Sequence, residues 1–109
     1  MDIDAPTLRG STPLVVAAAH GMVDVLRALV AKGANVHAKT EAGLTALHAA
    51  AHKGQMATVR WLIAHGADPR KGARWLDGVP RRASTLADHY GYSEVGAYLR
   101  TCEERAEAA

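Results

Sequence analysis

The sequence predicts an all-α fold in which short helix-turn-helix units stack side by side into a solenoid. The main observation is a repeat, because six pairs of identical residues recur 33 positions apart, a period typical of stacked helical hairpins. These pairs are Thr12 and Thr45, Leu14 and Leu47, Gly21 and Gly54, Leu29 and Leu62, Gly33 and Gly66, and Ala34 and Ala67. The composition agrees, since the chain has no Phe and leans on small apolar residues that let helices pack closely. One hairpin cannot bury its own apolar face, so neighbouring units must stack.

The first unit has the residues expected at the ends of two helices. Thr12 can cap a helix N-terminus with its hydroxyl, and Pro13 suits the first helical position, where its missing N–H is not needed. Gly21 and Gly33 can each adopt the left-handed conformation that ends a helix. Between these glycines, apolar residues recur at helical spacing at Val23, Leu26, Leu29 and Val30. The second unit repeats this arrangement from Thr45 to Gly66.

Two stretches of the chain resemble ankyrin repeats, GSTPLVVAAAHGMVDVLRALVAKGANVHA and GLTALHAAAHKGQMATVRWLIAHGADP. The resemblance covers about residues 10 to 72 and rests on the period, the helix caps and the glycines together. It implies a short ankyrin-repeat solenoid with projecting β-turn fingers, which acts as a non-catalytic module that binds another protein. The expected organisation is one domain, residues 1–109, with repeats at about 7–39, 40–72 and 73–109.

The third unit departs from the pattern in a way that predicts a divergent C-terminal capping repeat. Gly91 follows Gly54 by 37 positions, so four extra residues lengthen the third finger. Arg82 and Ser84 take the Thr and Leu positions of the second unit, and Arg100 takes an apolar position of the second helix. Polar residues at stacking positions are expected where the last face of a solenoid meets water. The hydrophilic tail is expected to extend the last helix.

The first unit has no comparable polar cap. Apolar side chains are expected at its open end, namely Val15, Val16, Met22 and Val25. Either the short N-terminal arm covers this end, or the end docks on further repeats or on a second copy of the chain. Because exposed apolar patches often mark interaction sites, self-association through the first repeat is one expectation.

The sequence predicts no catalytic, metal or cofactor site. His48 and His52 lie four positions apart on one predicted helix, a spacing found in zinc-binding helices. No Glu follows His48, and Cys102 is the single cysteine, so the usual further ligands are missing. His48 also stands in the His slot of the ankyrin T-P-L-H pattern, which implies a local hydrogen bond that orders the turn. Trp61 and Tyr98 occupy equivalent positions and are expected to stack on each other at the edge of the core.

Basic and aromatic residues gather on the side that the resemblance assigns to a partner, the ends of the first helices and the fingers. The helix-end candidates are His20, His52, Lys53, His89 and Tyr90, and the finger candidates are Arg9, Arg70, Lys71, Arg74, Trp75, Arg81 and Arg82. Acidic residues are expected largely elsewhere, on second helices and in the tail at Glu103, Glu104 and Glu107. Arg and Trp are common in binding hot spots, and an Arg-rich surface favours acidic partners.

The favoured function is therefore a protein-interaction module that binds an acidic loop or peptide, more tightly at low salt and in mildly acidic solution. The alternative is an anion or nucleic-acid binder that uses the Arg-rich finger around Trp75, although a net charge of +2 is small for nucleic acid. A third interpretation is a charged loop without a ligand. No leader and no apolar run of about 20 residues is found, so an intracellular, cytoplasmic or nuclear protein without a membrane partner is expected.

Overall fold

The computed structural model describes residues 13–37, 44–74 and 80–108, and these ranges form helices with one short β-hairpin. The helices are α1 (Pro13–Ala19), α2 (Val23–Ala31), α3 (Ala46–His52), α4 (Met56–Ala64), α5 (Ala83–His89) and α6 (Ser93–Ala108). Strand β1 (Gly72–Arg74) pairs antiparallel with β2 (Pro80–Arg82), with Ala73 opposite Arg81. The predicted all-α stack is confirmed, and the long third finger is this hairpin.

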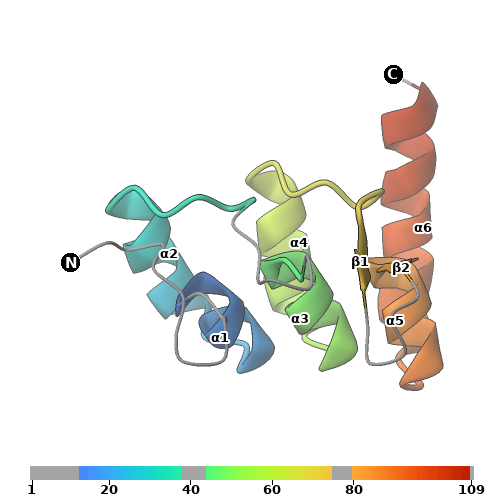
Figure 1. The fold of residues 1–109 in the computed structure, drawn as a ribbon, viewed down its shortest axis with the longest axis horizontal. Coiled ribbons are helices and arrows are strands. Elements are labelled where there is room, and N and C mark those ends of the chain that lie inside the picture. The colour runs from blue at the N-terminus through green and yellow to red at the C-terminus, as the bar shows by residue number, and fades with distance from the viewer. Residues whose placement is uncertain (1–12, 38–43, 75–79, 109) are drawn as a thin grey trace.

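The helices lie in two rows (Figure 1). The inner helices α1, α3 and α5 pack side by side, and the outer helices α2, α4 and α6 form the second row behind them. Each inner helix also packs on the outer helix that follows it in the sequence. The hairpin lies beside α5, at the end of the molecule where the third helix pair stands.

Glycines end the inner helices as the sequence predicts. Gly21, Gly54 and Gly91 have φ angles of 68°, 68° and 87°, which favour glycine because a Cβ is strained there. At the end of α3 the N–H of Gln55 donates to the carbonyl of Ala50 at 2.9 Å. This bond closes a Schellman turn, which satisfies carbonyls at the helix end and turns the chain into α4.

Thr45 caps α3, as predicted, and does so together with His48. The backbone N–H of His48 faces the Thr45 hydroxyl at 3.5 Å, and the backbone N–H of Thr45 donates to His48 Nδ1 at 3.3 Å. This reciprocal pair is a capping box with a histidine in the third helical position. Helix α1 begins at Pro13, as expected, whereas Thr12 lies outside the described residues.

One leucine-rich core runs along the whole stack. Its largest members are each at most 1% exposed, and they are Leu14, Leu26, Leu47, Leu62, Leu86 and Leu99. Burying one such side chain stabilises the fold by about 1.5–3 kcal/mol. The inner helices are also rich in buried alanines, of which Ala18, Ala50 and Ala51 are fully buried. Small side chains let α1, α3 and α5 approach closely, as the composition predicts.

The third helix pair closes the stack with polar side chains. Helix α6 has 16 residues, whereas α4 has 9, so the tail does extend the last helix. Arg100 is exposed and forms an ion pair with Asp88 of α5, which confirms the prediction that this face meets water. The predicted stacking of Trp61 on Tyr98 is wrong. Trp61 instead stacks on His65 at 3.9 Å, and the Arg60 guanidinium lies over the Tyr98 ring at 5.1 Å.

Candidate protein-binding site

Three predicted site residues form a ring cluster at the C-terminal ends of α3 and α5. His52 and His89 are the last residues of these helices, and Tyr90 is the C-cap of α5. The ring centroids of His52 and Tyr90 lie 4.3 Å apart, and His89 packs edge to face on Tyr90 at 5.0 Å. Tyr90 is 38% exposed, so the cluster bridges two repeats while it stays accessible to a partner.

A cation flanks this ring cluster. Lys53 follows His52 as the exposed C-cap of α3. Burial lowers the pKa of His52, and the positive charge of Lys53 lowers it further. The His52 ring is therefore neutral at pH 7, and a carboxylate placed beside Lys53 would favour its protonation. His20 is exposed just after α1 and occupies the position of Lys53 one unit earlier.

The basic hairpin is held to α3 by His48. Its Nε2–H donates to the carbonyl of Lys71 at 2.9 Å, which leaves Nδ1 to accept from the Thr45 hydroxyl at 2.8 Å. The ring is fully buried, and burial lowers its pKa despite the favourable backbone contacts. The predicted local role of His48 is confirmed, and its second nitrogen reaches the next finger as well. Both ring nitrogens are occupied, so His48 would have to break a hydrogen bond to ligate a metal.

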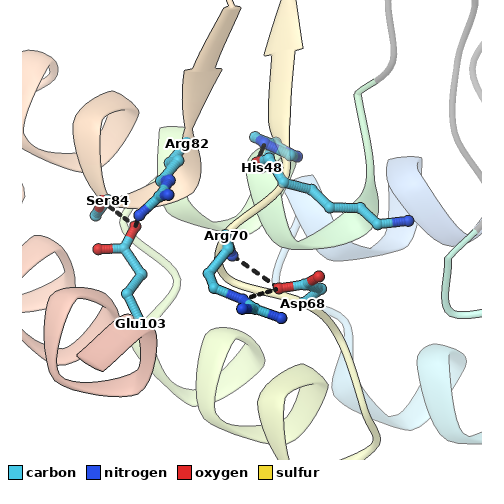
Figure 2. A network of polar contacts seen from close by, with 7 residues as sticks. His48, Asp68, Arg70, Arg82, Ser84 and Glu103 are labelled. Atoms are coloured by element: carbon cyan, nitrogen blue, oxygen red, sulfur yellow. Dashed lines mark hydrogen bonds and ion pairs between the residues drawn. The ribbon is translucent and has the colours of Figure 1, made fainter. Parts of the chain in front are cut away.

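Two of the predicted arginines are already paired with acids, as Figure 2 shows. Arg70 Nε lies 3.5 Å from Asp68 Oδ1, and the Arg70 backbone N–H donates to the same oxygen at 2.9 Å. That backbone hydrogen bond is the main cause that holds the pKa of Asp68 below its usual range; burial opposes it, and the Arg70 charge lowers the pKa further. Arg82 Nη1 lies 3.7 Å from Glu103 Oε1. These side chains are therefore less available to an acidic partner than the sequence predicts.

The expected segregation of acidic residues into a solvated tail is wrong for Glu103. This side chain is buried, with the residue 7% exposed, and it accepts a hydrogen bond of 2.9 Å from the Ser84 hydroxyl. Ser84 stands where the second repeat has a core leucine, and a buried hydroxyl needs a partner. The sequence carried a signal for this contact, because helical spacing from Val95 and Leu99 brings Cys102 and its neighbour Glu103 to the inward side of α6.

The other finger candidates are only partly described. Lys71 is exposed and Arg81 is half-buried in β2. Arg74 belongs to β1, but its side chain lies outside the described part of the structure, as do Arg9 and Trp75 entirely. The proposed anchoring role of Trp75 therefore stays a prediction.

A shallow pocket of about 330 Å³ adjoins the turns that follow the ring cluster. It lies between the second and third helix pairs, and its lining includes Gly54, Met56, Gly91, Tyr92 and Val95. This pocket could not be predicted from the sequence, because it depends on the Tyr92 ring lying across Gly54. The pocket has the size and partly apolar lining to accept one aliphatic side chain of a partner.

Two further kinds of feature are absent from the described residues. No group of three or more His, Cys, Asp or Glu side chains there could hold a metal ion. Over the same ranges, no helix has both the length and the apolar character needed to cross a bilayer.

The stacked hairpins, the left-handed glycines and the Thr–His cap define a helical-repeat protein that presents its inner helices and a finger on one side. The chain belongs to the ankyrin repeat family, since a family model described as ankyrin repeats (3 copies) matches residues 1–73. The third helix pair lies beyond the matched residues. No curated protein matches the chain. Ankyrin repeats are generally protein–protein interaction modules and are typically non-catalytic, so the chain is assigned to this class.

Proposed function

We propose that the chain binds an acidic segment of a partner protein across the ring cluster and the basic hairpin. The main support for this proposal is the contact between the rings of His52 and Tyr90. It places an accessible aromatic surface from two repeats beside Lys53. Lys53 and Lys71 are exposed, and neither makes an ion pair with another described residue. These two cations are therefore the ones most available to a partner carboxylate.

The basic hairpin and the ring cluster with Lys53 lie at opposite ends of the inner helices. The hairpin ends at Arg82, directly before α5 begins, and the ring cluster forms where α5 ends. Because α5 has 7 residues, the two groups are separated by about 10 Å along the helix axis. An extended partner segment of about three to four residues spans this distance. The proposed ligand therefore carries two acidic positions at that spacing, with an apolar residue near the pocket between the turns.

The rings and the cations have different roles in this proposal. Aromatic side chains that are desolvated on binding contribute most of the affinity at protein interfaces. Exposed lysines mainly accelerate and orient the encounter, so their effect weakens as salt is added. Arg70 and Arg82 already form ion pairs with Asp68 and Glu103, so they contribute to the shape of the site more than to its charge.

The ion pairs of Arg70 with Asp68 and of Arg82 with Glu103 argue against nucleic acid as the ligand. A nucleic-acid footprint needs several unneutralised cations aligned along a groove. Here two arginines of the hairpin region have carboxylates within 4 Å, at 3.5 Å and 3.7 Å. The acidic peptide is therefore the better-supported ligand class.

A peptide panel tests the proposal. Fluorescein-labelled octapeptides with paired Asp or Glu residues at varied spacing, and matching peptides with Asn or Gln, are titrated against the chain at about 50 mM and about 500 mM salt. We expect acidic peptides to bind at least tenfold more tightly than amide peptides, and the preference to shrink in high salt. The triple variant Lys53→Ala, Lys71→Ala, Tyr90→Ala should lose this binding.

The matched control changes Arg27→Ala and Lys32→Ala, two exposed cations at and just after the outer helix α2. Circular dichroism establishes that every variant folds. Equal loss of binding in the control, or no preference for acidic over amide peptides, contradicts the proposal. Tighter binding to a single-stranded or double-stranded oligonucleotide, with a steep salt dependence, would favour the nucleic-acid alternative.

A further inference from the structure

The three helix pairs reveal which surface positions face a neighbouring unit. Within the described ranges, the third pair has only a preceding neighbour and the first pair has only a following one. A position that is buried in the second and third pairs but exposed in the first must therefore face the preceding side of the stack.

Val16 of α1 satisfies this criterion. It is 41% exposed, whereas its counterparts Ala49 in α3 and Leu86 in α5 are 3% and 0% exposed. Pro13 shows the same trend more weakly, since it is half-buried at a position that is buried in the later inner helices. The open side of α1 thus presents the surface that α3 and α5 bury against the unit before them.

Val25 of the outer helix α2 satisfies the criterion as well. It is 38% exposed, whereas its counterparts Thr58 and Val95 are 1% and 4% exposed. Leu29, one turn further along α2, is only partly buried, although its counterparts in the other outer helices belong to the fully buried core. Both helices of the first pair therefore leave stacking positions open on the same side.

Met22 lies on this side too, at the turn between α1 and α2. In the second and third pairs, the residue that follows the turn glycine lies against the turn glycine of the preceding pair. Gln55 lies against Gly21 in this way, and Tyr92 lies against Gly54. A Cβ on Gly21 would meet the Gln55 side chain, and one on Gly54 would meet the Tyr92 ring. Met22 is the counterpart of Gln55 and Tyr92 and is 48% exposed, so it extends towards a unit that the described structure does not contain.

The opposite end of the stack differs in chemistry. Ala18 is fully buried against α3, but its counterpart in the third pair is Asp88, which is exposed and paired with Arg100. Val15, which the sequence placed on the open N-terminal end, is 4% exposed, and its exposed third-pair counterpart is Thr85. Val15 therefore faces the second unit, and polar residues occupy the following-side positions where the third pair meets water.

We propose that the N-terminal face, formed by Val16, Met22, Val25 and Leu29, binds the same face of a second copy of the chain across a two-fold axis. The face continues the unit-to-unit interface of the stack and carries no charged side chain at its stacking positions. A head-to-tail contact would instead bury Asp88 and the charge paired with it under apolar residues, which is costly. Two identical apolar faces match each other, as closed two-fold dimers require.

The dimer is expected to be weak, because the face is only one helix pair wide and lies at the small end of specific interfaces. It leaves the ring cluster and the hairpin uncovered, so it is independent of the proposed peptide binding. Sedimentation velocity from about 10 µM to about 1 mM should show a concentration-dependent shift that stops at a dimer.

The test variant is Val16→Lys with Val25→Lys, which places four cations in the proposed interface, and it should weaken dimerisation at least tenfold. The matched control is Thr85→Lys with Ala97→Lys, which adds the same charge at exposed positions of the third pair and should dimerise like the wild type. An NMR dilution series of the wild-type chain needs no variant. Its concentration-dependent amide shifts should lie in α1 and α2 and not in α5 or α6.

Three results would overturn the proposal. A wild-type chain that stays monomeric over the whole range shows that the face is covered by something other than a second copy. Assemblies that grow beyond the dimer show a head-to-tail contact. Equal weakening in the test and control variants shows that added charge, rather than the N-terminal face, controls association.

Discussion

Ser84 and Glu103 form a buried polar pair whose two members are expected to depend on each other strongly. The Ser84 hydroxyl donates to Glu103 Oε1 at 2.9 Å, and the two residues are 4% and 7% exposed. We consider Ser84→Ala, Glu103→Met and the two changes together. Each single change leaves one polar group without this partner in a place that water hardly reaches, whereas the double change leaves an apolar contact.

The structure sets the expected magnitudes. Ser84→Ala removes a hydrogen bond to a charged acceptor, worth about 1.5–3 kcal/mol, and leaves the carboxylate with Arg82 at 3.7 Å. Glu103→Met leaves the Ser84 hydroxyl without this hydrogen-bond partner, which lowers the free energy of unfolding by about 1–3 kcal/mol. The double variant is expected to lie within about 1 kcal/mol of the wild type, because apolar replacement of a buried polar pair is often nearly neutral. The coupling energy between the two sites is then about 2–4 kcal/mol.

Urea unfolding followed by circular dichroism measures all three variants and completes the double-mutant cycle. Glu104→Met is the matched control, since Glu104 is the exposed neighbour of Glu103 and its replacement should change stability by less than about 0.5 kcal/mol. If the two single losses simply add, with a coupling below about 0.5 kcal/mol, the buried pair does not form and the account of the C-terminal cap is wrong.

Gly54→Ala is expected to destabilise the fold by about 1–3 kcal/mol more than Gly66→Ala, as measured by chemical denaturation. Both glycines have positive φ, 68° and 93°, but only at Gly54 would the added Cβ overlap a ring, that of Tyr92; equal losses would mean that the ring moves aside at little cost. Stability is also expected to fall as the pH drops below the ordinary histidine value of 6.5, because burial lowers the pKa of His48. The unfolded chain then binds a proton that the folded chain excludes, which gives a slope of about 1.4 kcal/mol per pH unit. His48→Gln should remove the share of this slope that His48 contributes, as measured by urea titrations at several pH values, and part of the slope should remain because burial also lowers the pKa of His52; a slope that His48→Gln leaves unchanged contradicts the assignment.

The architecture could be predicted from the sequence because its causes are local. A glycine is needed wherever φ is positive, and Gly21 and Gly54 recur at the period of one helical hairpin. The Thr45 cap and the role of His48 follow from positions three residues apart. The ring cluster was also predictable, since aligning the units on their glycines places His52 and Tyr90 at neighbouring helix ends.

The charged part of the site was harder to predict, because it depends on contacts between distant segments. Glu103 reaches Arg82 and Ser84 only because α6 continues past the usual length of an outer helix and turns this carboxylate inward. From the sequence, Arg82 is expected to be an available cation, whereas in the structure the Glu103 carboxylate lies 3.7 Å from its guanidinium. The pairing of Arg70 with Asp68 is local, but it forms only in the turn that leads into the hairpin.

Helix α5 links the cap to the proposed binding site, and this link constrains the partner. Its first turn carries Ser84, which is held by Glu103, and its C-cap is Tyr90 of the ring cluster. A rigid helix between the hairpin and the rings fixes their separation, so a partner segment gains from both contacts only when its acidic positions match that spacing. Glu103→Met removes the contact that holds Ser84 at the start of α5. It should therefore reduce the preference for one spacing of the acidic residues in the peptide panel more than it reduces the affinity for any one peptide. A variant that lost affinity uniformly, with its spacing preference intact, would show that the hairpin and the rings act independently.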